Sequence, residues 1–128
     1  MAAYLLDTSV IIDALNGKKN RWELLGSLVE AGDTLACSAI TIAEIYADVR
    51  RHEASRTQTF LDGLDCYDVD PELARYAGWL KNDWAKLGRT LSISDVLIAA
   101  TALVHRLVLM TDNRKDFPMP DVTLYPLP

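Results

Sequence analysis

Carboxylate side chains occur in four separate parts of the chain: at Asp7, at Glu44, at Asp95 and in the stretch from Asp112 to Asp116. Asp7 follows the apolar run 4–6, and Asp95 precedes the apolar run 96–100. A carboxylate held beside buried segments is costly unless it is paired or binds a cation. These acids are therefore candidates for chemistry rather than ordinary surface charges.

Three or four carboxylates gathered in one crevice repel one another, and the pKa of at least one of them rises. A divalent cation removes that conflict, and a shell made only of oxygen atoms suits Mg²⁺ or Mn²⁺. Such a site can activate water and stabilise the oxygens of an in-line displacement at phosphorus. No cysteine–histidine pair and no glycine-rich phosphate loop offers a competing chemistry.

Each acid also has a simpler structural interpretation. Glu44 follows Thr41 by three residues and Asp95 follows Ser92 by three residues, which is the spacing of a helix capping box. An acid in the first helical turn is also favoured by the helix macrodipole. Asp7 taken alone is a polar residue that ends a strand. The functional interpretation therefore depends on the acids meeting in the fold.

The apolar pattern predicts the elements that would bring these acids together. Strands are predicted at 4–6, 35–37, 64–69 and 107–110, with a last edge strand at 122–125 among prolines. Helices are predicted at 10–15, 21–31, 41–51, 53–59, 71–87 and 94–105. Strands that alternate with helices favour an α/β fold with a mostly parallel sheet, in a single domain over residues 1–128. Ligands of such sheets bind beyond the carboxyl ends of the strands, where Asp7 and the 112–116 stretch lie.

The composition limits the other possibilities. The chain is 50% hydrophobic and 24% charged, which suits a folded domain, and no apolar run approaches the roughly 20 residues of a membrane helix. No basic segment precedes the first strand, so we expect no signal peptide and a cytoplasmic protein. Cys37 and Cys66 are expected to be buried free thiols.

A net charge of −5 argues against nucleic-acid binding, because domains that bind nucleic acids usually carry a basic face. Clustered active-site carboxylates inflate the negative count, however, and bound cations would offset it locally. Basic residues also occur in three groups, each expected on the solvated surface: Lys18-Lys19-Arg21, Arg50-Arg51-His52 with Arg56, and Arg114-Lys115.

Four segments between residues 6 and 117 carry motifs around these acids. They are Leu6-Asp7-Thr8-Ser9-Val10-Ile11-Ile12, Ile42-Ala43-Glu44-Ile45-Tyr46, Ser94-Asp95-Val96-Leu97-Ile98-Ala99-Ala100-Thr101-Ala102 and Leu109-Met110-Thr111-Asp112-Asn113-Arg114-Lys115-Asp116-Phe117. In this order, and in a chain of this length, they resemble the motifs of PIN-domain ribonucleases, specifically the VapC-type toxins of bacterial toxin–antitoxin pairs.

The resemblance implies a three-layer α/β/α sandwich around a mostly parallel sheet. It implies an endoribonuclease that depends on Mg²⁺ or Mn²⁺ and leaves a 5′-phosphate on the cleaved RNA. It also implies a homodimer that is neutralised by a small VapB-like antitoxin, whose tail enters the active site. Position by position, the resemblance implies these catalytic and metal-binding acids: Asp7, Glu44, Asp95 and Asp116.

Supporting roles follow from the same resemblance. Thr8 or Ser9, together with Thr111, would orient carboxylates or water. The fourth acid stays open, because Asp112 is an extra acid close to Asp116. The order of preference is Asp116, then Asp112, with Asn113 as a hydrogen-bonding helper.

Two other functions remain open from the sequence. One is a PIN-like module, catalytically weak or inactive, that binds RNA or a protein; the intact acidic set argues against it. The other is a Mg²⁺-dependent phosphatase with Asp7 as nucleophile. Such sites resemble Asp-x-Asp, and Ser9 stands where the second aspartate would be.

Several aromatic residues have two possible roles. The stripe of Tyr76, Leu80 and Trp84 repeats at helical spacing, so it is expected in the core, as are Trp22 and Trp79. The alternative is a surface for a dimer partner or an antitoxin, since Trp and Tyr are enriched at interfaces.

Overall fold

The computed structural model describes all residues from 1 to 128 and contains one sheet of four parallel strands. The strands are β1 (Ala3–Leu6), β2 (Thr34–Ser38), β3 (Asp65–Tyr67) and β4 (Val108–Met110), and their order across the sheet is β3-β2-β1-β4. Leu5 of β1 lies opposite Ala36 of β2 and Leu109 of β4. The predicted α/β fold with a parallel sheet is confirmed.

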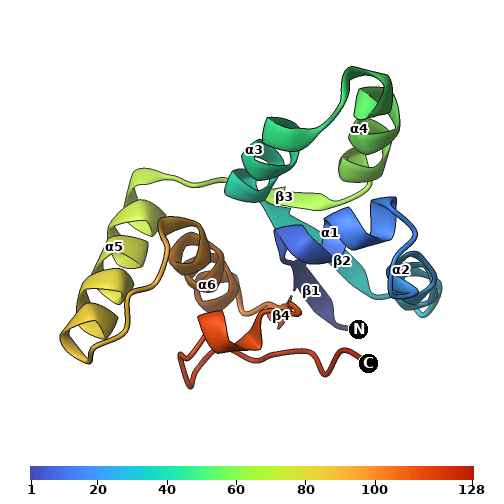
Figure 1. Ribbon diagram of the computed structural model, residues 1–128. Helices are drawn as coiled ribbons and strands as arrows, with labels where there is room; N and C mark the ends of the chain where they lie inside the picture. The colour runs from blue at the N-terminus through green and yellow to red at the C-terminus, as the bar shows by residue number, and fades with distance from the viewer.

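Six helices cover the two faces of the sheet: α1 (Thr8–Leu15), α2 (Arg21–Glu30), α3 (Ala39–Asp48), α4 (Ala54–Asp62), α5 (Pro71–Lys86) and α6 (Ile93–His105). Two short 3-10 turns, η1 (Arg51–Glu53) and η2 (Arg114–Asp116), precede α4 and follow β4. The pair α5 and α6 lies on one side of the sheet, and α1 and α2 lie on the other (Figure 1). These layers confirm the α/β/α sandwich.

Alternation along the strands divides the core into two halves. Leu5 and Leu109 pack into the cluster beneath α5 and α6, whereas the next residues, Leu6 and Met110, pack into the cluster beneath α1 to α4. All four side chains are fully buried. Successive strand residues point to opposite faces, so two buried faces require the continuous apolar runs that the sequence contains.

The start of α3 differs from the prediction. Ser38 caps this helix by accepting a hydrogen bond from the Ile40 N–H at 3.3 Å, so the helix begins at Ala39. Thr41 is buried inside the helix, and the predicted capping box between Thr41 and Glu44 is therefore wrong. The helix-cap explanation of Glu44 no longer applies.

Two predictions about strands need correction. The last strand reduces to an isolated bridge between Leu124 and β4, because Pro120 and Pro126 lack the N–H groups that a longer ladder would need. Cys37 is a buried free thiol as predicted, but Cys66 is exposed because it lies on β3, an edge strand.

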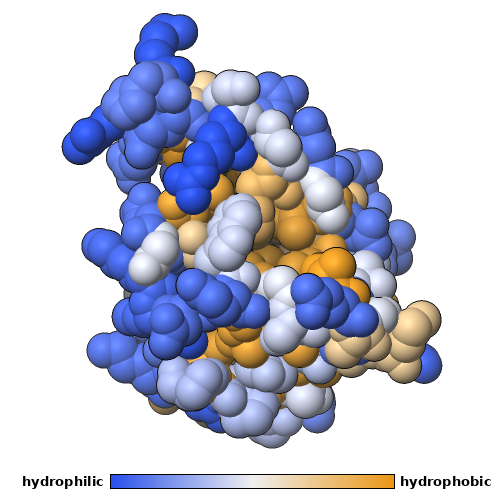
Figure 2. All heavy atoms as spheres, turned by 90° about the vertical axis from the view of Figure 1, so that its right-hand side faces the viewer, coloured by the Kyte–Doolittle hydropathy of each residue, from blue (hydrophilic) through white to orange (hydrophobic).

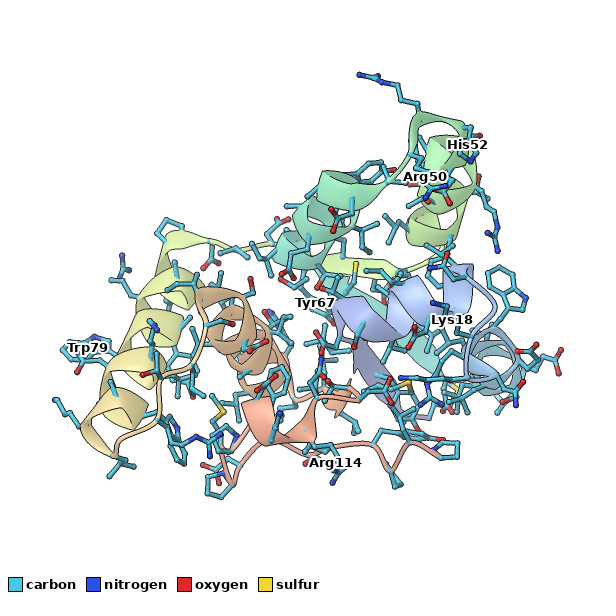
Figure 3. All side chains as sticks on the ribbon, viewed as in Figure 1. Lys18, Arg50, His52, Tyr67, Trp79 and Arg114 are labelled. Atoms are coloured by element: carbon cyan, nitrogen blue, oxygen red, sulfur yellow. The ribbon has the colours of Figure 1, made fainter.

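The aromatic residues are less buried than predicted. Leu80 and Trp84 pack partly against the core, but Tyr76, Trp79 and Trp22 are exposed. Trp79 points outward from α5 (Figure 3) and is 61% exposed. No helix of the fold is both long enough and apolar enough to cross a membrane.

Candidate active site

The fold brings four acids from four different elements to one region. Asp7 follows β1 and caps α1, Glu44 lies on α3, Asp95 lies in the first turn of α6, and Asp116 ends η2 after β4. Burial chiefly raises the pKa of Asp7, and the charges of Glu44 and Asp116 raise it further, so these acids lie close enough to interact. The charges of Asp116, Asp7 and Glu44 likewise raise the pKa of Asp95.

Asp7 is the most deeply buried of the four acids, at 5% exposure. Its Oδ1 accepts a hydrogen bond from the Thr8 N–H at 2.8 Å, and its Oδ2 accepts one from the Thr111 hydroxyl at 2.6 Å. Burial raises the pKa of Asp7, the bonds from Thr111 and Thr8 lower it, and the neighbouring acids raise it. The position of this carboxylate is thus fixed by two bonds while its ionised form remains strained.

Glu44 is held by a hydroxyl from the helix that Asp7 caps. The Thr8 hydroxyl donates to Glu44 Oε1 at 2.8 Å, and the Thr41 hydroxyl lies 3.2 Å from Thr8 Oγ1. Thr8 therefore contacts both Asp7, through its N–H, and Glu44, through its side chain. Sequence reasoning missed Thr41 because its spacing from Glu44 favoured a cap.

Asp95 combines a structural and an electrostatic feature. Its N–H donates to the Ser92 hydroxyl at 3.1 Å, so the predicted cap of α6 is real. Burial chiefly raises the pKa of its carboxyl group, the Ser92 hydroxyl lowers it, and the other three acids raise it. The helix cap therefore positions this acid without removing its conflict with the neighbouring charges.

The two candidates for the fourth acid, Asp112 and Asp116, lie in the segment that follows β4 and differ in their contacts. Asp112 Oδ1 accepts a hydrogen bond from Arg21 Nη2 at 2.8 Å, and Asp112 Oδ2 lies 3.7 Å from Lys19 Nζ. Asp112 is not among the charges that raise the pKa of Asp7 or Asp95, whereas Asp116 is. The electrostatics thus group Asp116 with the other acids, whereas the contacts of Asp112 pair it with cations.

The supporting residues differ in what they contact. The Asn113 N–H donates to Thr111 Oγ1 at 3.0 Å, so its backbone and not its exposed side chain makes this bond. The Ser9 hydroxyl is buried and has no hydrogen-bond partner. Arg21 was expected on the surface but is only 2% exposed, because its guanidinium turns inward to Asp112.

The chemistry of the four acids matches that of a divalent-ion site. All the candidate ligands are carboxylate oxygens, and a cation would relieve the burial and repulsion that raise the pKa of Asp7 and Asp95. No three acidic, histidine or cysteine side chains lie close enough to hold an ion among themselves. Mg²⁺ commonly keeps several waters and uses one or two carboxylates together with substrate phosphate. The residues therefore fit a hydrated ion better than a closed protein cage.

The PIN domain matches this chain over residues 4–121. The chain belongs to the PIN-domain family. Among its relatives is Ribonuclease VapC19 of Mycobacterium tuberculosis, which is 34% identical and aligns over 92% of this chain and 95% of the relative. Ribonuclease VapC2 of Haemophilus influenzae is 29% identical over 91% of each chain.

Solved toxin–antitoxin complexes contain chains of similar fold. The complex VapBC2 from Rickettsia felis, bound to a DNA fragment from its promoter, contains a chain with a TM-score of 0.83 and 27% identity. The alignment covers 96% of this PIN domain and 97% of that chain. A toxin–antitoxin complex from Klebsiella pneumoniae gives a TM-score of 0.77 and 30% identity, over 94% and 95% of the two chains.

Proposed function

We propose that this PIN domain is an endoribonuclease, the toxin of a toxin–antitoxin pair, and that it requires Mg²⁺ or Mn²⁺. The observation that carries the proposal is the buried Asp7, fixed by Thr111 and within electrostatic reach of Glu44, Asp95 and Asp116. The relatives named Ribonuclease VapC and the toxin–antitoxin complexes of similar fold support the biological role.

Asp7 and Asp95 would hold the ion most directly, with Glu44 and Asp116 completing its surroundings. When bound, the ion supplies Lewis-acid activation of water and compensation of the phosphate charge. Thr111 keeps one oxygen of Asp7 fixed, and Thr8 keeps Oε1 of Glu44 fixed. This leaves Oε2 of Glu44 available to accept a hydrogen bond from the attacking water. Hydrolysis would release a 5′-phosphate.

The test is cleavage of RNA by the purified chain, freed of any bound antitoxin. Cutting should require Mg²⁺ or Mn²⁺, stop with EDTA, and be lost in Asp7→Asn and in Asp95→Asn. Asp48→Asn is the matched control, because Asp48 is an exposed acid at the end of α3 and its charge change is the same. Cleavage that persists in both active-site variants, or that ignores EDTA, would exclude the proposed chemistry.

We propose that a small VapB-like antitoxin covers apolar surface on this toxin, and that the toxin forms a homodimer. On the face where α2 and α4 lie, apolar side chains gather in a recess bordered by hydrophilic ones (Figure 2). Trp22 of α2, 48% exposed, contacts Phe60 of α4 with ring centroids 5.7 Å apart.

Co-expression with a short neighbouring reading frame should yield a complex that does not cut RNA. Light scattering of the free toxin should give twice the mass of one chain.

The second candidate is a PIN-like module that binds RNA or protein without cutting. The lack of any three-ligand cluster favours this candidate, because one or two carboxylates alone bind an ion more weakly than three converging ligands. Calorimetric titration with Mn²⁺ separates the two functions. Binding that Asp7→Asn removes supports the nuclease, and the absence of binding supports the inactive module.

A further inference from the structure

Arg21 is a buried cation outside the acidic cluster. It is the first residue of α2, and only 2% of it is exposed. Its Nη2 donates to Asp112 Oδ1 at 2.8 Å and to the Pro128 backbone oxygen at 3.3 Å, and its Nη1 donates to the Lys19 backbone oxygen at 3.3 Å. A buried guanidinium is costly unless it is paired and hydrogen-bonded, so these contacts restrain the segments that carry them.

The most important of those segments is the loop that follows β4. Asp112 comes directly after Thr111, whose hydroxyl bonds to Asp7, and directly before Asn113, whose N–H bonds to Thr111. Asp116 lies four residues further along the same loop. The ion pair between Arg21 and Asp112 therefore anchors the loop between Thr111, which contacts Asp7, and Asp116, which belongs to the acidic cluster.

A second cation lies beside the same anchor. Lys19 Nζ lies 3.7 Å from Asp112 Oδ2 and 3.5 Å from Asp13 Oδ2 on α1. Asp7 caps the other end of α1. The ion pairs thus connect α1, α2 and the loop, which are the elements that hold Asp7, Arg21 and Asp116.

We infer that Arg21 is a positioning residue for RNA cleavage: through Asp112 it holds the loop that aims Thr111 and Asp116 at Asp7. This inference rests on the proposed ribonuclease activity. A misplacement of about 1 Å can slow a reaction by about 100-fold, so a loop that is folded but loosely held would be catalytically poor. Lysine could not replace Arg21, because it lacks the planar fork that reaches three acceptors at once.

The test separates positioning from stability with an apolar replacement of the pair. Arg21→Met leaves Asp112 with Lys19 as its only cation, and Asp112→Leu leaves the buried Arg21 without a counter-charge, so each variant should have a lower Tm. The double variant should recover most of the lost Tm, since apolar pairs often replace buried ion pairs without loss. Its kcat should nevertheless fall at least about tenfold with KM nearly unchanged, because the loop has lost its anchor.

Leu61→Ala is the control for destabilisation alone. Leu61 lies on α4 and is buried in the apolar cluster beneath α1 to α4, so this variant should lose Tm but keep its kcat per folded molecule. A double variant with recovered Tm and unchanged kcat would overturn the positioning role.

A measurement on the metal-free protein keeps this inference distinct from the proposed activity. In NMR spectra of the double variant, amide signals of residues 113–116 should broaden through exchange, while those of α6 should stay sharp. Sharp loop signals would overturn the inference even if the enzyme is active. Broad loop signals in the double variant, together with an unaltered protein that does not cut RNA, would support the anchor and reject the nuclease.

Discussion

The hydrogen bond from Thr111 to Asp7 offers a quantitative test of the site. Thr111→Val removes the hydroxyl, and with it also the acceptor of the Asn113 N–H, but keeps the shape of a side chain that is only 1% exposed. A hydrogen bond to a charged group contributes about 1.5–3 kcal/mol, and the 2.6 Å distance is that of a charge-assisted bond. We expect a loss of about 2 kcal/mol at neutral pH, which is about 7 °C in Tm for a domain of this size.

The pH dependence of this loss has a definite sign. Thr111 donates to the ionised form of Asp7, so it lowers the pKa of a carboxyl group that burial raises. Thr111→Val should therefore raise the pKa of Asp7 further. The loss of stability should be full above that pKa and should shrink as the pH falls and Asp7 becomes protonated. The acid limb of the pH–activity profile should move to higher pH.

Thr101→Val is the matched control for Thr111→Val. Thr101 is also fully buried, but its hydroxyl donates at 2.8 Å to the Leu97 carbonyl within α6 and not to a carboxylate. Its replacement should change the free energy of unfolding by less than about 1 kcal/mol and leave the acid limb of the pH–activity profile in place. Equal Tm losses in the two variants, or an unmoved acid limb in Thr111→Val, would refute the role of this bond. Thermal unfolding across a pH series and initial cleavage rates supply both measurements.

Three further predictions concern the acids and the thiols. Asp116→Asn should lower kcat at least about tenfold at unchanged Tm. Asp112→Asn should instead lower Tm by about 10 °C, because it leaves the charge of Arg21 unpaired at a cost of about 3 kcal/mol. Steady-state rates and melting curves measure the two effects, and the reverse pattern would exchange the roles of the two acids. Asp95→Asn should raise the Tm of the metal-free protein at neutral pH, because burial and neighbouring acids raise the pKa of Asp95 and so disfavour its ionised form. The gain in Tm should vanish below about pH 4, where Asp95 is protonated in the unfolded chain as well. A lower Tm of the variant at neutral pH would contradict this reasoning. An alkylating reagent should label Cys66 but not Cys37, since burial and the neighbouring Cys66 raise the pKa of Cys37 to about 12; mass spectrometry of the native protein would expose the opposite result.

The fold could be predicted from the sequence where local patterns and burial agree. Leu5 and Leu6 form a continuous apolar pair because each faces a different core, and Asp7 follows where the strand must end. The same logic placed Asp95 at the start of a buried helix. The prediction of burial failed for Cys66, because an apolar sequence pattern alone does not distinguish an edge strand from a central one. The prediction of the helix start failed for α3 because Ser38 and Thr41 are both good caps, and only the strand end selects between them.

The fourth acid shows the limit of local patterns most clearly. Asp112 and Asp116 are four residues apart, and the sequence around them does not distinguish which of the two faces Asp7. The deciding contact comes from Arg21, which lies 91 residues earlier and was expected on the surface with Lys18 and Lys19. An exposed arginine would leave Asp112 free for the acidic cluster, whereas a buried one requires a counter-charge and takes the nearest carboxylate. The burial of one cation thus assigns one acid to structure and leaves the other for chemistry.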